Sequence, residues 1–208
     1  MEPRQFKLRV TYGKTGRLAM LSHLEITHAL ERMVRRANLP FALSNGFSPH
    51  MKIAFGSALP VGIGGAQEIF DLTLDDYVAP AKALEALQQA APTDLMPTAA
   101  EYVESSAKAA SVAYPASVYE VVFDGPIDGV SWPETIEVTR KGKQKTLLVD
   151  DYLVGKPVIE GDVLRFQLVS SNAGNLRPDV FVKALSFSDG AGLQPQSITR
   201  VSQSAQPL

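Results

Sequence analysis

The side chains that could do acid–base chemistry or bind an anion gather in the first quarter of the sequence. All three histidines, His23, His28 and His50, lie there. His50 follows a proline in the segment SNGFSPHMKIAFG, residues 44–56, and Lys52 comes two positions later. A loop histidine near a cation could act as a general base or contact a phosphate. It could equally bond a local carbonyl group in a turn, and the residue types leave both interpretations open.

The other two histidines do not form a metal-binding pair. His23 and His28 are five positions apart on a predicted helix, which places them on different faces, so the i, i+4 zinc pair is not formed. His23 falls toward the apolar side, which favours a packed, hydrogen-bonded ring, and His28 lies among arginines, where solvent is expected. A zinc site would require His23 and His50 to meet a carboxylate. The nearest candidates are Glu25, Glu68 and Asp71. We therefore expect no metal.

Several classes of site and of protein are excluded or unsupported. The chain has no cysteine, which excludes disulfides, thiolate nucleophiles and thiolate-bound metals. Common phosphate-loop and nucleophile motifs are absent, and GIGGAQ (residues 62–67) opens no helix, so no cofactor is expected. No apolar run reaches membrane-spanning length, and MEPRQFKLRV lacks the apolar core of a signal peptide. These features predict a cytoplasmic protein without membrane contact.

The charge is distributed unevenly along the chain. Residues 1–56 hold nine lysines and arginines against three acids, a net charge of +6, and the remainder carries −8. A basic first quarter on an acidic body predicts one face made for an anionic partner. The alternative is a dipolar but inert surface.

The basic residues are placed by a predicted strand and helix. FKLRVTY (residues 6–12) alternates as a half-buried strand does. A helix of about sixteen residues should follow a turn, with a capping box at Ser22 and Glu25 and an end before Pro40. One face of this helix is apolar and carries Ile26, Leu30, Met33, Val34 and Ala37. The opposite face carries Glu25, His28, Arg32, Arg35 and Arg36.

The remaining elements predict an α+β protein with two ferredoxin-like halves and antiparallel sheets. A short strand at 41–43, an apolar run at 52–63, a strand at 67–74, a helix at 79–91 and a strand at 94–104 complete a β-α-β-β-α-β order. The second half is less regular: it shows strands, a hairpin turning at 141–143 and a helix after Arg177, but no helix between its first two strands. We place the domains at 1–106 and 107–208, with the boundary region at 105–116.

Cations from the turn, the helix and the loop could line one groove in the first half. Phe47 and Phe55 are available there for stacking on bases, although both could instead be core residues. The predicted anion- or RNA-binding residues are Arg17, Arg32, Arg35, Arg36, Ser44, Phe47, His50 and Lys52.

Three segments also carry a family resemblance. TGRLAMLSHLE, RRANLPFALSNGFSPHMKIAFGSALPVG and EIFDLTL resemble a family of unknown function whose members are fused to, or encoded beside, radical S-adenosylmethionine proteins, often near RNA-processing and ribosomal genes. The resemblance runs from Phe6 to residues 198–200 and is specific in the first seventy residues. Where relatives tend to have an acid and a serine, this chain has Gly64 and Gly65. No activity is established for the family, so the resemblance implies a partner and not a reaction.

These observations support hypotheses from three classes. Radical S-adenosylmethionine chemistry needs three thiolates on an iron–sulfur cluster, so a chain without cysteine can take part only as a separate subunit. We expect a non-catalytic accessory protein that binds RNA, either tRNA or ribosomal RNA, through the basic groove. The first alternative is a protein–protein adaptor that docks on the radical enzyme without RNA contact. The second is a metal-free RNA-processing enzyme that uses His50 or His23; the sequence does not decide whether the protein is an enzyme.

Overall fold

The structure is a computed structural model that describes residues 5–140, 142–170, 174–188 and 192–207. The chain divides into two units, Met1–Ala113 and Tyr114–Leu208, called unit 1 and unit 2 below. Helices and antiparallel sheets occur in both units, which confirms the predicted α+β class. No helix within the described residues is long and apolar enough to cross a lipid bilayer.

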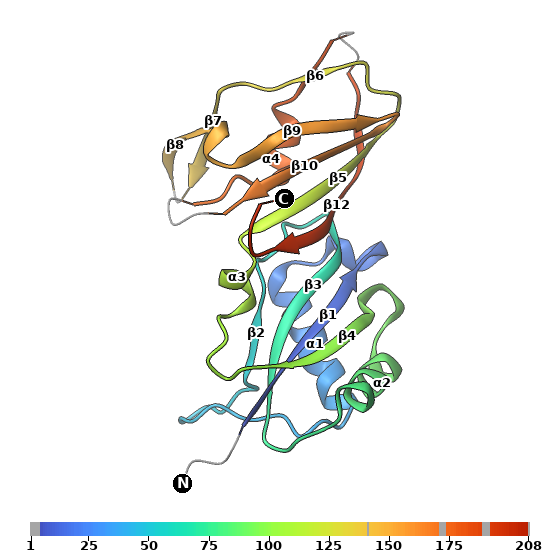
Figure 1. Cartoon of the computed structure of the whole chain (residues 1–208), viewed down its shortest axis with the longest axis vertical. Helices are drawn as coiled ribbons and strands as arrows, with labels where there is room; N and C mark the ends of the chain where they lie inside the picture. The colour runs from blue at the N-terminus through green and yellow to red at the C-terminus, as the bar shows by residue number, and fades with distance from the viewer. Residues whose placement is uncertain (1–4, 141, 171–173, 189–191, 208) are drawn as a thin grey trace. The chain divides into compact units, whose positions relative to one another are not determined.

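Unit 1 combines one antiparallel sheet with two main helices (Figure 1). Its elements are β1 (Phe6–Lys14), the short 3-10 helix η1 (Gly16–Met20), α1 (His23–Arg36), β2 (Ile53–Phe55), β3 (Ile63–Leu74), α2 (Pro80–Ala90), η2 (Thr93–Leu95), β4 (Pro97–Val103) and the single turn α3 (Ala110–Ala113). The strands lie in the order β4-β1-β3-β2, and each neighbouring pair is antiparallel. This order is compatible with a ferredoxin-like unit.

The core of unit 1 lies between the helices and one face of the sheet. Alternate residues of β1 and β3, such as Leu8, Phe70 and Leu72, are fully buried, as the period of a strand requires. The apolar stripe of α1 packs against them, and its residues Ile26, Leu30, Met33 and Val34 are all buried. The predicted helix face is therefore confirmed.

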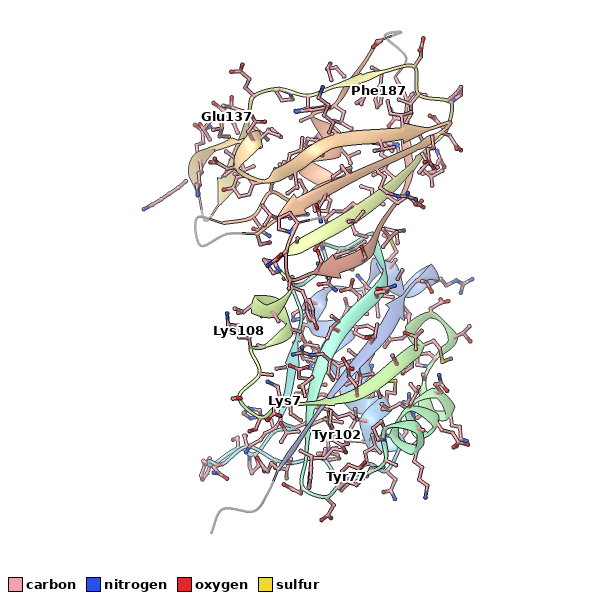
Figure 2. The ribbon with its side chains drawn as sticks, in the orientation of Figure 1. Lys7, Tyr77, Tyr102, Lys108, Glu137 and Phe187 are labelled. Atoms are coloured by element: carbon pink, nitrogen blue, oxygen red, sulfur yellow. The ribbon has the colours of Figure 1, made fainter. Side chains whose placement is uncertain are left out.

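The other face of the sheet carries a buried ion pair. Arg9 and Asp71 lie opposite each other on β1 and β3, and the guanidinium donates from Nε to Oδ1 at 2.7 Å and from Nη2 to Oδ2 at 2.9 Å. Arg9 also donates to the carbonyl of Lys108, and Lys7 donates to that of Ala107 (Figure 2). These bonds hold the segment after β4 on unit 1. The division between the units falls after Ala113, which is later than 106/107 and lies within the boundary region 105–116 expected from the sequence.

A hairpin extends the sheet at the end where β1 begins. The strand predicted at 41–43 forms two isolated bridges instead, Phe41 with Leu74 and Leu43 with Met51. Further backbone bonds join Ala42 to Thr73 and Lys52 to Ala42. Segment 41–52 is thus a hairpin anchored at the end of β3.

Unit 2 repeats the sheet order without the first helix. Its sheet runs β12-β5-β10-β9 and all its pairs are antiparallel; the strands are β5 (Ala116–Phe123), β9 (Leu153–Glu160), β10 (Val163–Val169) and β12 (Pro195–Ser204). The predicted hairpin is present as β7 (Thr135–Arg140) and β8 (Lys143–Leu148), although Lys141 of its turn lies outside the described residues. Helix α4 (Pro178–Lys183) begins at the predicted proline, and the small strands β6 (Val130–Ser131) and β11 (Ser186–Phe187) pair with each other. As predicted, no α-helix lies between β5 and β9 in the part of the chain that the structure describes.

Candidate nucleic-acid interface

A capping box sets where α1 begins and so where its arginines lie. The Ser22 hydroxyl accepts from the Glu25 amide at 3.4 Å, and the Glu25 carboxylate accepts from the Ser22 amide at 2.8 Å and from its hydroxyl at 2.7 Å. These bonds stabilise the charged carboxylate and lower the pKa of Glu25. The predicted capping box is confirmed.

The three arginines of α1 are all exposed but differ in their contacts. Arg36 donates from Nε and Nη2 to the carbonyl of Ala90 at 3.2 and 2.7 Å, so it ties α1 to the end of α2. The guanidinium carbon of Arg35 lies 5.1 Å from the ring centroid of Phe41, a cation–π distance. Arg32 makes no hydrogen bond or ion pair within the described residues. Arg32 and Arg35 are the better placed of the three to meet an external anion.

The loop of residues 44–50 is closed by bonds between its two ends. The Ser44 amide donates to the His50 carbonyl at 2.8 Å, and the Ser44 hydroxyl accepts from the His50 amide at 3.1 Å. The His50 Nδ1 lies 3.1 Å from that hydroxyl and 3.3 Å from the Ser48 carbonyl oxygen. Gly46 has a φ of 139°, which favours glycine, so the turn is shaped by the backbone as well as by the serine.

Phe47 projects fully from this loop. Its side chain has a relative exposure of 104%, the largest of any exposed large hydrophobic residue in the described part of the chain. The alternative that Phe47 belongs to the core is therefore wrong. A rigidly closed loop that presents one bare aromatic ring can stack on a base or enter an apolar pocket.

Lys52 joins the hairpin to the amino end of β1. Its ammonium donates to the side-chain oxygen of Gln5 at 3.0 Å, and Gln5 donates in turn to Asp75 at 3.0 Å. The ring of Phe41 lies under the Arg35 guanidinium, and Phe41 pairs with Leu74 of β3. Leu74 in turn pairs with Phe6, the first residue of β1. The last turns of α1, segment 41–52 and the start of β1 therefore lie together. We call this region the loop end of unit 1.

Arg17 lies at the opposite end of β1. It follows the last strand residue, whereas Gln5 precedes the first, and a nine-residue strand measures roughly 27 Å. The turn around Arg17 is occupied internally, because its amide donates to Asp94 Oδ2 at 3.1 Å. Gly16 has a φ of 50°, and a Cβ there would lie 2.5 Å from the same oxygen. The structure does not bring Arg17 together with the other predicted site residues.

His23 and Phe55 also lie away from the loop end. The two rings meet edge to face, with centroids 5.4 Å apart at 89°, and Phe55 is half-buried, so Phe55 packs rather than stacks on a ligand. Although His23 is exposed, its ring lines a cavity of about 20 Å³ together with buried Lys14 and Glu68. That volume holds about one water molecule and no substrate.

The sequence interpretation named Glu68 only as a candidate zinc ligand and did not predict that Lys14 and Glu68 are both buried. Lys14 donates to the Ile63 carbonyl at 3.3 Å, and the Glu68 side chain lies where a Cβ on Gly65 would be, 2.5 Å from its Cγ. Strand parity could have revealed both. Lys14 shares the parity of Leu8 on β1, and Glu68 shares the parity of the buried residues 70, 72 and 74 on β3. A serine at position 65 would displace the Glu68 side chain from its present position.

Comparison with known protein families matches residues 7–178 to a family described as an uncharacterized protein conserved in bacteria (DUF2344). The chain belongs to this family. No curated protein matches the chain.

For this DUF2344 protein, the matched span covers nearly all of unit 1 and reaches the start of α4 in unit 2. The family description names no activity, ligand or partner. The described residues contain no group of three or more histidine and carboxylate side chains that could hold a metal ion. Asp71 pairs with Arg9, and His23 and His50 lie on different parts of unit 1. Any function of this DUF2344 chain must therefore be argued from the loop end itself.

Proposed function

We propose that this protein is a non-catalytic accessory protein that binds RNA, either tRNA or ribosomal RNA, at the loop end of unit 1. One observation carries the proposal: the fully exposed ring of Phe47 on a loop closed by hydrogen bonds. Single-stranded RNA is recognised largely by stacking of unpaired bases on aromatic rings, with cations contacting the backbone. Lys52, Arg32 and Arg35 lie at the same end of the unit and supply the cations.

The partner in this proposal is a separate radical S-adenosylmethionine enzyme. It is supported by the resemblance of the first seventy residues to proteins linked to such enzymes. A chain without cysteine cannot hold the iron–sulfur cluster, so the chemistry would occur on another polypeptide and this protein would present the RNA.

Fluorescence anisotropy with total tRNA at several salt concentrations tests the RNA function. Phe47→Ala should lower the affinity by about 1–3 kcal/mol, because one stacked base is lost. Its stability should change by less than about 0.5 kcal/mol, because the ring touches no core residue. No binding at low salt, or binding indifferent to salt, would overturn the RNA function.

Two arginines provide a matched pair for the location of the interface. Arg32 and Arg17 are both exposed, but only Arg32 lies near the loop end. Arg32→Gln should weaken tRNA binding and reduce the steepness of its salt dependence by about one phosphate contact. Arg17→Gln should leave both unchanged. An equal loss in both variants would mean that RNA covers a different surface.

A second candidate is the adaptor that binds the radical enzyme without RNA, because an exposed phenylalanine can also anchor a protein interface. In that case the two proteins should co-purify after nuclease treatment, and Phe47→Ala should abolish the complex. Loss of the complex on nuclease treatment would favour RNA as the bridge.

The metal-free RNA-processing enzyme has less support. Nδ1 of His50 already contacts the closed loop, and His23 lines a cavity too small for a substrate. Cleavage of RNA that persists in EDTA and disappears in both His50→Ala and His23→Ala would favour this alternative. Intact RNA after prolonged incubation with the protein would remove it.

A further inference from the structure

A second aromatic feature lies at the same end of unit 1, in a cleft that the sequence interpretation did not identify. The cleft encloses about 450 Å³, within the usual range for small-ligand sites. It is lined by residues from the start of β1, the segment after β3 and the end of β4; these are Gln5, Lys7, Tyr77, Tyr102, Glu104 and Ser105. Figure 2 shows Lys7, Tyr77 and Tyr102 grouped in this region.

The rings of the cleft are held in place before any ligand arrives. The Tyr102 hydroxyl donates to the Val78 carbonyl at 2.9 Å and accepts from the Val78 amide at 3.2 Å. Tyr77 stacks on Tyr102, with centroids 5.2 Å apart at 28°, and Phe6 meets both rings edge to face. One face of Tyr77 is thus covered by Tyr102. Since Tyr77 as a whole residue is 61% exposed, we infer that the other face of its ring is open to solvent.

The rim of the cleft offers both a donor and an acceptor. The Lys7 ammonium donates to the Ala107 carbonyl at 2.7 Å and lies 3.7 Å from Asp71 Oδ2. An ammonium has three N–H groups, so it can still donate to a ligand. Lys7 pairs with Val103 across the strands, so Glu104, one residue further along, shares the parity of Tyr102, and its exposed carboxylate lines the same cleft. A carboxylate only accepts hydrogen bonds and can take two at once.

We propose that this cleft binds a guanine base, stacked on the open face of Tyr77. Guanine carries neighbouring N1–H and N2–H₂ donors beside the O6 acceptor, and the two donors suit the carboxylate of Glu104, which lines the cleft with Tyr77. Adenine offers no such pair of donors beside an acceptor oxygen. The base could belong to an RNA bound at the loop end or to a free guanine nucleotide, since both present the same edge. The RNA arm rests on the proposed function, and the free-nucleotide arm does not.

Isothermal titration with GMP and AMP tests the free-nucleotide arm. Wild-type protein should bind GMP, and Tyr77→Ala should weaken that binding roughly 5- to 150-fold, the range for one stacked base. Tyr77→Phe is the matched control, because it keeps the ring and should keep the affinity. Glu104→Gln should remove the preference for GMP over AMP. Tyr77 is exposed, so all these variants should fold, which their melting temperatures would verify.

Anisotropy with single-stranded oligonucleotides, with and without guanine, tests the RNA arm. If Phe47→Ala weakens RNA binding and Tyr77→Ala does not, and GMP fails to bind at millimolar concentration, the cleft is not a base site and the proposed function stands. If GMP binds through Tyr77 but no RNA binds, the cleft is a free-nucleotide site and the RNA function is overturned. Equal affinity for GMP and AMP would overturn the assignment of guanine.

Discussion

Replacing Asp71 by alanine should strongly destabilise unit 1. Asp71 is 3% exposed and Arg9 is 7% exposed, and two short hydrogen bonds join them. Removing one partner of a buried ion pair costs about 3–5 kcal/mol, because the other charge stays buried without compensation. Lys7, 3.7 Å from the same carboxylate, raises the cost, whereas the bond from Arg9 to the Lys108 carbonyl limits it. We expect about 4 kcal/mol, close to a thousand-fold in the unfolding equilibrium.

The assay must report on unit 1 alone. The single tryptophan, Trp132, lies in unit 2, so its fluorescence does not follow unit 1. Hydrogen–deuterium exchange of peptides from β1 and β3 reports on unit 1, because these amides exchange when the hydrogen bonds between the two strands open. Peptides from β5 and β10 of unit 2 provide the internal control and should keep their protection.

A double variant separates the ion pair from a simple loss of packing. Arg9→Met combined with Asp71→Leu removes both charges and should recover most of the protection that Asp71→Ala loses. The reasoning would be refuted if Asp71→Ala costs less than about 1 kcal/mol, or if the double variant costs as much as the two single changes added. Either outcome would mean that Asp71 does not stabilise the fold through Arg9.

Two further predictions concern the start of α1. Gly16→Ala should destabilise unit 1 by about 2 kcal/mol or more, because a left-handed φ is unfavourable for alanine and its Cβ would meet the Asp94 carboxylate. Thermal unfolding measures this loss. Gly142→Ala is the control without the clash, because Gly142 has a φ of 74° and no atom of the described residues lies near the position of its Cβ. Glu25 has a folded-state pKa below its ordinary value of 4.5, so its contribution to stability is present above that pH and is lost as the pH falls through the lowered pKa. An NMR titration of the Ser22 amide, which donates to this carboxylate, should therefore show a midpoint below 4.5, and Glu25→Gln should abolish the transition; a midpoint at or above that value contradicts the capping account.

Local patterns predicted most of unit 1, because the signals that define its elements lie close together in the chain. The apolar stripe and capping box predicted α1, and alternation predicted β1 and β3. The exposure of Phe47 could not be predicted this way. It depends on bridges between the ends of the hairpin and on the attachment of Ala42 to Thr73, which are set by tertiary structure. A phenylalanine between glycine and serine is compatible with a core position as well as with a loop tip.

Arg17 lies outside the group of cations for a reason that the sequence itself contains. Arg17 lies in the turn after β1 and Lys52 in the hairpin after α1, and their proximity depends on which end of β1 each one meets. The turn after a strand lies at the strand's carboxyl end, whereas a hairpin that follows the return helix lies at its amino end. The length of the strand, roughly 27 Å, then separates them.

The net charge of the first quarter also overstates what an RNA would meet. Lys7 and Arg9 both lie against Asp71, whose one negative charge offsets one of theirs, Lys14 is buried, and Arg36 bonds a helix-end carbonyl. Among the described residues, the cations left at the loop end are Arg32, Arg35 and Lys52.

The salt dependence of RNA binding distinguishes a surface with three available cations from one on which the full net charge of +6 acts. Each neutralised phosphate contributes a slope of about −0.7 to −0.9 in log K against log salt, so three cations predict a slope of about −2 to −3. A field from all six net charges would instead give about −4 to −5. Because three phosphate contacts supply little affinity at physiological salt, stacking must supply much of the rest, and Phe47→Ala should then weaken binding without changing the slope. If the slope is steep, and if Phe47→Ala changes neither the slope nor the affinity, then the exposed ring is not used for RNA binding.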